Sequence, residues 1–248
     1  MQVYEYIRSE ARAGRKLLAV LLDPEKECDL MHVAKLTVSA DVKIVLVGGS
    51  GYKKPVDEYV VRLRTCFEQA GGGKGNPYIV LFPGDVSQVS RHADALLFLS
   101  LLSSRDAELL IGQHVRAAEK VKESGIETIA MGYILVDGGR VSTVERVTGS
   151  RALRDTREIT ATAMAGEMSG KRLIYLEAGS GAEKPVQSDI IKTVRCCTSV
   201  PLIVGGGIKT VGQMNEAFSA GADMVVIGNH FEEMPEDIVK FAREANKL

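Results

Sequence analysis

Eight short apolar runs recur along the chain, and most are followed by a stretch whose apolar residues have helical spacing. Continuous apolar runs of this kind are typical of strands buried on both faces of a parallel sheet. Eight strands that alternate with helices predict an α/β protein, and a (β/α)8 TIM barrel rather than a doubly wound open sheet. The predicted strands are residues 16–22, 42–47, 78–82, 95–99, 127–135, 173–177, 201–204 and 224–227.

The third repeat of this pattern is incomplete. Only about a dozen residues separate the strands at 78–82 and 95–99, which is short for a crossover helix, so we expect the third helix to be shortened or altered. An amphipathic stretch at 1–13 should cap one end of the barrel. Residues 105–124 and 185–195 should be helical, and 137–150 should be a polar loop. No linker interrupts the pattern, so residues 1–248 are expected to form a single TIM-barrel domain.

Composition excludes several classes of function. The formal net charge of −1 gives no electrostatic basis for a nucleic-acid partner. No run approaches the roughly 20 apolar residues of a membrane span, and the first residues lack the plan of a signal peptide. We therefore expect a cytoplasmic enzyme without a stable membrane anchor. The cysteines have no metal-ligand spacing and are expected to be reduced and mostly buried: Cys28, Cys66, Cys196 and Cys197.

Residues 175–182 read Tyr-Leu-Glu-Ala-Gly-Ser-Gly-Ala and lie between a predicted strand and a helix that should begin at Pro185. Glycines let a backbone approach a ligand closely, and N–H groups near a helix N-terminus favour an anion. Taken alone, the segment describes equally well a glycine turn with a solvated Glu177. The next two strands also end in glycines, at 205–207 and at Gly228-Asn229, so three neighbouring turns predict a phosphate site.

Two polar residues end the first two strands. Asp23 precedes Pro24, and Ser50 lies in a Gly-Gly-Ser-Gly turn. A carboxylate with a hydroxyl suits Mg²⁺, which prefers few protein ligands together with substrate phosphates. A helix-entry cap for Asp23 and an ordinary turn for Ser50 remain alternatives, and Asp137 is a weaker ligand candidate. Lys26 and Lys209 begin predicted helices, where solvation competes with anion binding.

These strand ends carry a resemblance that runs nearly the full length of the chain. The sequence resembles the geranylgeranylglyceryl phosphate synthase family, which includes the bacterial heptaprenylglyceryl phosphate synthases. No single element is specific, but the set is: Leu-Leu-Asp-Pro-Glu-Lys at 21–26, Val-Gly-Gly-Ser at 47–50, Leu-Phe-Pro-Gly at 81–84, Ala-Asp-Ala-Leu-Leu-Phe-Leu-Ser at 93–100, Gly-Tyr-Ile-Leu at 132–135, Tyr-Leu-Glu-Ala-Gly-Ser-Gly at 175–181, the glycines at 205–207 and Gly-Asn at 228–229.

The resemblance implies a prenyltransferase with an altered third helix. The C3 hydroxyl of sn-glycerol 1-phosphate would attack C1 of a prenyl diphosphate, most simply geranylgeranyl diphosphate, and diphosphate would leave, forming the first ether bond of an ether lipid. The resemblance also assigns a bound Mg²⁺ to Asp23 and Ser50, and it implies a homo-oligomer. The resemblance places glycerol phosphate on Tyr175, Leu176, Glu177, Ala178, Gly179, Ser180, Gly181, Gly206, Gly207, Gly228 and Asn229.

Glu177 and Tyr175 are the candidate catalytic residues. Glu177 is placed to accept or orient the hydroxyl proton, and Tyr175 is better suited to positioning the glycerol. The prenyl tail needs an apolar groove, for which Leu101, Leu102, Tyr133 and Leu135 are candidates that equally suit the core. The alternatives are an isomerase or aldolase acting on a sugar or triose phosphate and a non-catalytic phosphate-binding barrel. An aldolase would want a strand-end lysine, whereas Lys171 precedes its strand.

Overall fold

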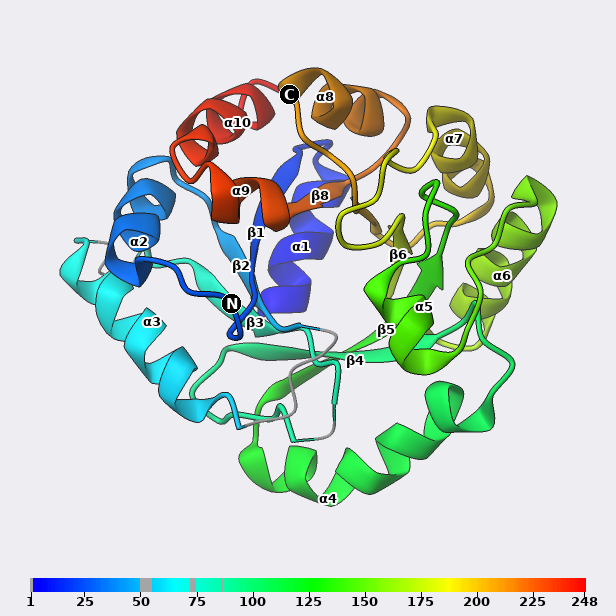
Figure 1. Cartoon of the computed structure of the whole chain (residues 1–248), viewed down its shortest axis with the longest axis horizontal. Coiled ribbons are helices and arrows are strands. Elements are labelled where there is room, and N and C mark those ends of the chain that lie inside the picture. Colours follow the sequence, from blue (N-terminus) through cyan, green and yellow to red (C-terminus); the bar gives the residue numbers. More distant parts are fainter. Residues whose placement is uncertain (1, 50–54, 72–74, 86) are drawn as a thin grey trace.

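The structure, a computed structural model, describes residues 2–49, 55–71, 75–85 and 87–248. Its eight strands pair in sequence order, each parallel to the next, and β8 closes onto β1 (Figure 1). The predicted (β/α)8 barrel is therefore confirmed. The strands are β1 Leu17–Leu22, β2 Ile44–Val47, β3 Tyr78–Leu81, β4 Ala95–Leu101, β5 Glu127–Leu135, β6 Leu173–Glu177, β7 Leu202–Gly205 and β8 Met224–Ile227.

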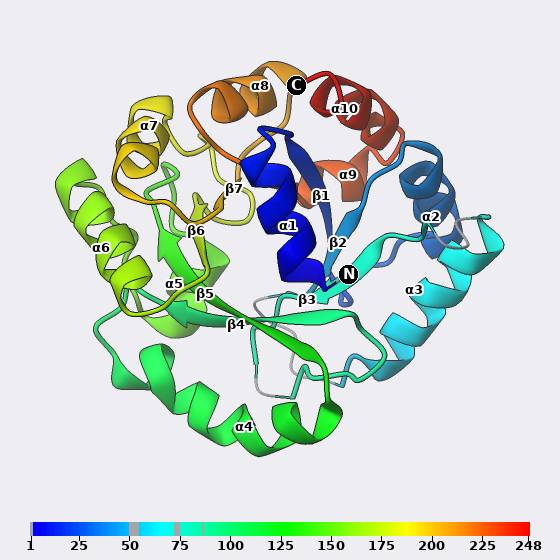
Figure 2. The same cartoon turned by 180° about the vertical axis from the view of Figure 1, so that it is seen from behind.

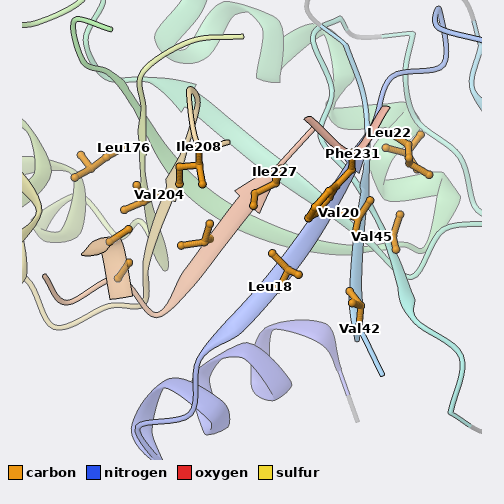
Figure 3. Packing of buried hydrophobic residues seen from close by; sticks show 14 of the residues in the cluster. Leu18, Val20, Leu22, Val42, Val45, Leu176, Val204, Ile208, Ile227 and Phe231 are labelled. Carbon is orange, nitrogen blue, oxygen red and sulfur yellow. The ribbon is translucent and has the colours of Figure 1, made fainter. Parts of the chain in front are cut away.

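Side chains from these strands divide between two apolar clusters, because successive residues of a strand point to opposite faces. Leu17, Ala19 and Ile203 belong to the cluster that fills the barrel interior. Leu18 and Val20 belong to the cluster between the sheet and its surrounding helices, part of which Figure 3 shows. Each barrel strand is thus buried on both faces, which explains its unbroken apolar sequence.

Helix α1 (Val3–Arg12) crosses the end of the barrel from which the strands begin, as Figure 2 shows. Its buried residues Val3, Tyr4 and Ile7 join the interior cluster. The carboxylate of Glu127, at the start of β5, accepts hydrogen bonds from the Val3 and Tyr4 N–H groups at 2.6 and 3.1 Å, which satisfies donors that a helix start leaves unpaired. The predicted cap is confirmed, and this end of the barrel is closed.

Apart from α1, the longer helices form a ring around the barrel (Figure 1). Between β3 and β4, the described residues of 82–94 form turns and no helix, which confirms the altered third crossover. The helices are α2 Leu30–Ser39, α3 Asp57–Gln69, α4 Gln113–Ser124, α5 Thr143–Thr148, α6 Thr156–Met168, α7 Ser188–Cys197, α8 Val211–Ser219, α9 Asn229–Glu233 and α10 Asp237–Ala245.

Several expected boundaries were wrong. Helix α7 begins at Ser188 rather than Pro185, and the helix expected over 105–124 begins as a π-helical turn, Glu108–Gly112, before α4. The expected loop at 137–150 contains α5, which starts with a capping box in which Ser142 and Glu145 exchange hydrogen bonds. Such a box satisfies two N–H groups at once and lets a short helix form within a polar sequence.

The four cysteines are unpaired, as expected, but they are not buried. Cys28 and Cys66 are half-buried, and Cys196 and Cys197 are exposed. The last two lie at the end of α7, whose buried face is formed by Ile190, Ile191 and Val194. Helical geometry turns the adjacent cysteines away from that face.

Candidate active site

The turns that follow β6, β7 and β8 meet at the open end of the barrel. Gly179, Gly181, Gly206 and Gly207 all have positive φ, between 69° and 102°, which favours glycine. A methyl group on Gly206 would lie 2.3 Å from Glu177 Oε1 and 2.6 Å from the Gly179 nitrogen. The backbone of two turns therefore packs directly together, and we refer to these glycine turns as the candidate phosphate cradle.

A cavity of about 300 Å³ opens beside these turns. Most of the predicted glycerol phosphate residues line it: Tyr175, Glu177, Ser180, Gly181, Gly206, Gly207, Gly228 and Asn229. Leu176 and Ala178 point elsewhere, because their side chains pack in the cluster between sheet and helices, and the Ala178 N–H is donated to the Gly205 carbonyl at 3.0 Å. These two residues can contribute to the site only through the backbone that they fix.

Glu177 ends β6 opposite Gly205 of β7, and only 6% of its surface is exposed. Oε1 accepts a hydrogen bond from the Gly179 N–H at 2.8 Å, which ties the carboxylate to the cradle. Burial raises the pKa of Glu177 above its usual value, and the Tyr175 hydroxyl and the Gly179 N–H oppose that rise. A buried carboxylate with a raised pKa takes up a proton more readily than a solvated one.

Aromatic side chains form the floor beside this carboxylate. The rings of Tyr175, Tyr133 and Phe82 lie 5.3–5.6 Å apart, centroid to centroid. The Tyr175 hydroxyl is fully buried and makes no hydrogen bond of good geometry with the described residues. Burial, and then the charge of Glu177, raises the pKa of Tyr175 well above its usual value, so its hydroxyl stays protonated. The hydroxyl can therefore donate to a ligand in the cavity.

The segment between β5 and α6 covers one side of the cavity, which no residue pattern predicted. Arg140 lines the cavity, and a methyl group on Gly181 would lie 2.2 Å from Arg140 Nη2. Ser142 packs equally closely on Gly179. Arg140 therefore supplies a guanidinium at the cradle, and only the tertiary contact between two loops identifies it.

Asp23 lies across the mouth, at the end of β1. Its Oδ1 accepts the Glu25 N–H at 3.0 Å, and a methyl group on Gly49 would lie 2.4 Å from the same oxygen. The end of β2 thus passes directly against this carboxylate. Ser50, the other predicted Mg²⁺ ligand, lies outside the described residues. Asp137 does not join Asp23, because it accepts the Gly139 N–H and pairs with Arg154.

A second, largely apolar pocket of about 130 Å³ begins at Asp23. The two pockets adjoin, because they share the lining residues Leu21, Phe82, Tyr133, Val144, Ser180, Gly228 and Asn229. Leu101 and Tyr133 line it as predicted. Leu102 instead packs near Gly132 and Ile174 between the sheet and the helices, and Leu135 is buried in the barrel interior.

Of two lysines considered in the sequence, Lys26 differs from expectation and Lys171 agrees with it. Lys26 is held by Glu232 and Asn229 at the mouth, so it is not simply solvated at a helix start. Lys171 donates to Ser100 Oγ at 2.6 Å and is not among the residues that line the two pockets at the mouth. The described residues contain no group of three or more His, Cys, Asp or Glu side chains suited to a metal. None of their helices has the length and apolar character to cross a membrane.

The fold and the site together define a (β/α)8 barrel with a candidate anion cradle built of glycine turns, a buried carboxylate and an adjoining apolar pocket. The chain belongs to the PcrB family, whose model matches residues 11–246.

Named relatives agree with this assignment. The chain is 41% identical to the geranylgeranylglyceryl phosphate synthase of Chitinophaga pinensis, over 93% of this chain and 90% of that protein. It is 38% identical to the Pyrococcus abyssi enzyme of the same name, with the same coverage of both chains. It also resembles the crystal structure of (S)-3-O-geranylgeranylglyceryl phosphate synthase from Thermoplasma acidophilum in complex with its substrate sn-glycerol-1-phosphate, with a TM-score of 0.86, 30% identity and full coverage of both chains.

Proposed function

We propose that this protein is a prenyltransferase that joins the C3 hydroxyl of sn-glycerol 1-phosphate to a prenyl diphosphate, with geranylgeranyl diphosphate as the first donor to test. One observation carries the proposal. The buried carboxylate of Glu177 lines the cavity at the cradle, and that cavity borders an apolar pocket. A polar phosphorylated acceptor and an apolar donor can meet only at such a boundary. The named relatives support the same reaction.

The acceptor is held by its phosphate. The backbone N–H groups of the glycine turns, the Ser180 hydroxyl and the Arg140 guanidinium surround the anion. The glycerol then extends towards Glu177 and Tyr175, which line the same cavity. Tyr175 donates a hydrogen bond to a glycerol oxygen and so orients it. Holding both reactants in this way converts a bimolecular reaction into one between fixed partners.

Glu177 is the proposed general base. As the C3 oxygen forms a bond to C1 of the donor, its proton passes to the Glu177 carboxylate. The bond between C1 and the diphosphate oxygen breaks, and diphosphate leaves with the bonding electron pair. Because burial raises the pKa of Glu177, the carboxylate is a stronger base than a solvated glutamate. The hydrogen bond from Gly179 keeps it aimed at the acceptor side.

We propose Mg²⁺ as the cofactor, held by Asp23 and Ser50. The oxygen ligands fit this ion, because Mg²⁺ favours one or two protein oxygens together with phosphate oxygens and water. Asp23 also lines the pocket that would receive the prenyl diphosphate. When bound there, Mg²⁺ would neutralise the charge of the leaving diphosphate. Asp23 is half-buried, and its Oδ1 accepts a hydrogen bond from the Glu25 N–H. This bond fixes the orientation of the carboxylate before any ligand binds. We also expect a homo-oligomer, which light scattering would test.

A product assay tests the reaction. The purified protein is incubated with radiolabelled sn-glycerol 1-phosphate, Mg²⁺ and prenyl diphosphates of several lengths, and label entering the organic phase is counted. Transfer is expected with sn-glycerol 1-phosphate and not with its 3-phosphate enantiomer. Folded protein that transfers label with none of the donors would refute the proposal and return attention to isomerase and aldolase chemistry.

A further inference from the structure

Lys26 lines the apolar pocket, and the turn that follows β1 fixes its backbone. The Lys26 N–H donates to the Asp23 carbonyl at 3.0 Å, which closes the turn Asp23-Pro24-Glu25-Lys26 after β1. The lysine side chain then spans from β1 to α9, the short helix that follows β8. Its Nζ forms an ion pair with Glu232 and donates to Asn229 Oδ1 at 3.1 Å. The side chain is 42% exposed, yet both of these contacts hold its head in place.

Glu232 and Asn229 connect this lysine to both halves of the site. Glu232 is only 11% exposed in its side chain, and its second oxygen accepts the Asp23 N–H at 3.3 Å. Asn229 Oδ1 also accepts from Ser180 Oγ of the cradle, at 3.1 Å. One polar chain thus runs from Asp23 through Glu232 and Lys26 to the phosphate cradle. Its cation lies between the candidate phosphate cradle and Asp23, the candidate metal ligand.

Each pocket has its own cations. Arg140 and Lys209 line the cavity at the cradle, and Lys26 does not. Lys26 lines the apolar pocket together with Asp23, and the other described residues that line that pocket include no Lys or Arg. An ammonium group has three donors, and the described residues occupy two on Lys26. The described residues therefore leave one donor of Lys26 at the end of the pocket where an apolar ligand would carry its charge.

We propose that Lys26 binds the diphosphate of the prenyl donor and stabilises it as it leaves, with Glu232 and Asn229 as the residues that position the ammonium group. This inference rests on the proposed transfer reaction. In that reaction the C1–oxygen bond of the donor breaks and its electron pair stays on the diphosphate, so negative charge grows beside Lys26. A preorganised cation contributes most where charge develops in the transition state.

The test compares Lys26→Met and Lys26→Arg with Lys35→Met, which changes an exposed lysine on the helix of the same repeat. Hydrogen bonds from charged donors contribute about 1.5–3 kcal/mol. Lys26→Met should therefore raise the KM for the prenyl diphosphate and weaken calorimetric binding of inorganic pyrophosphate about 10- to 150-fold. The KM for sn-glycerol 1-phosphate should change less than about threefold, because the cradle keeps its own cations. Lys26→Arg should recover most of the binding, and Lys35→Met should match the wild type.

The outcomes separate this inference from the function beneath it. Wild-type protein that makes no prenylated product refutes the proposed reaction, whatever the variants do. An active wild type with unchanged pyrophosphate binding in Lys26→Met refutes the role of Lys26 alone. Equal losses for both substrates in a folded Lys26→Met variant would also overturn it, because the lysine would then only hold Asn229 and the mouth together. Measuring pyrophosphate binding with and without Mg²⁺ keeps the result independent of turnover.

Discussion

Gly206→Ala should damage both the stability and the chemistry of this protein, because the new methyl group has no space. Gly206 has φ of +82°, and its methyl would lie 2.3 Å from Glu177 Oε1, 2.6 Å from the Gly179 nitrogen and 2.9 Å from the Ala178 nitrogen. Ordinary contacts begin near 3.4 Å. Relief therefore requires a shift of about 1 Å, and two of the three atoms belong to backbone.

The cost has two parts. A non-glycine residue in the left-handed region lowers the free energy of unfolding by about 1–2 kcal/mol. Overpacking lowers it by about 1–3 kcal/mol more. The sum is about 2–5 kcal/mol of unfolding free energy. Gly170→Ala is the matched control, because Gly170 has φ of +89° and nothing within 4 Å of the added methyl. The control should lose only the first part, about 1–2 kcal/mol.

The same displacement should reach the reaction. The atom nearest to the added methyl group is Oε1 of Glu177, the proposed base. A displacement of a catalytic group by about 1 Å can lower the rate about 100-fold. Urea unfolding gives the stability difference, and prenyl transfer with calorimetric binding of sn-glycerol 1-phosphate gives the functional one. The reasoning fails if Gly206→Ala is as stable as Gly170→Ala and retains wild-type turnover and affinity, because the cradle would then not be closely packed.

Three other changes probe the remaining groups. Glu177→Gln should reduce turnover far more than affinity for sn-glycerol 1-phosphate, and equal losses would make Glu177 a binding residue. In the wild type the rate should fall as the pH drops through the pKa of Glu177, which is raised above 4.5, and the pH–rate profile of the variant should lack this fall. The same raised pKa means that the wild type loses stability as pH rises from 4.5 through that pKa, so thermal unfolding should find Glu177→Gln the more stable protein at neutral pH. Asp23→Asn should raise the Mg²⁺ concentration needed for half-maximal rate, and an unchanged Mg²⁺ titration would remove Asp23 from the metal site. Arg140→Met should weaken calorimetric binding of sn-glycerol 1-phosphate about 10- to 150-fold through a lost charged hydrogen bond. Arg151→Met, which changes an exposed arginine in the same segment between β5 and α6, should bind normally, and normal binding by both variants would show that Arg140 does not touch the phosphate.

Much of the barrel could be predicted because its determinants are local. A strand buried on both faces needs an unbroken apolar run, and the order of runs and helices leaves few topologies open. Helix α5 was missed for a reason that is also physical. Six residues, Thr143–Thr148, have too few turns to show a periodic apolar face, and the helix depends on its cap and on packing over the cradle.

The sequence by itself determined the order of the strands and placed their ends to within one or two residues, and hence it showed that Glu177, Asp23 and the glycine turns meet at one rim. Strand ends of a closed parallel barrel must share an edge, so a linear pattern is enough. Only the tertiary structure decided which side chains from different loops touch. Two such contacts join segments that are far apart in the chain, namely Arg140 with Gly181 and Lys26 with Glu232. Those contacts depend on how loops of particular length fold across the barrel mouth, which no local pattern of residues encodes.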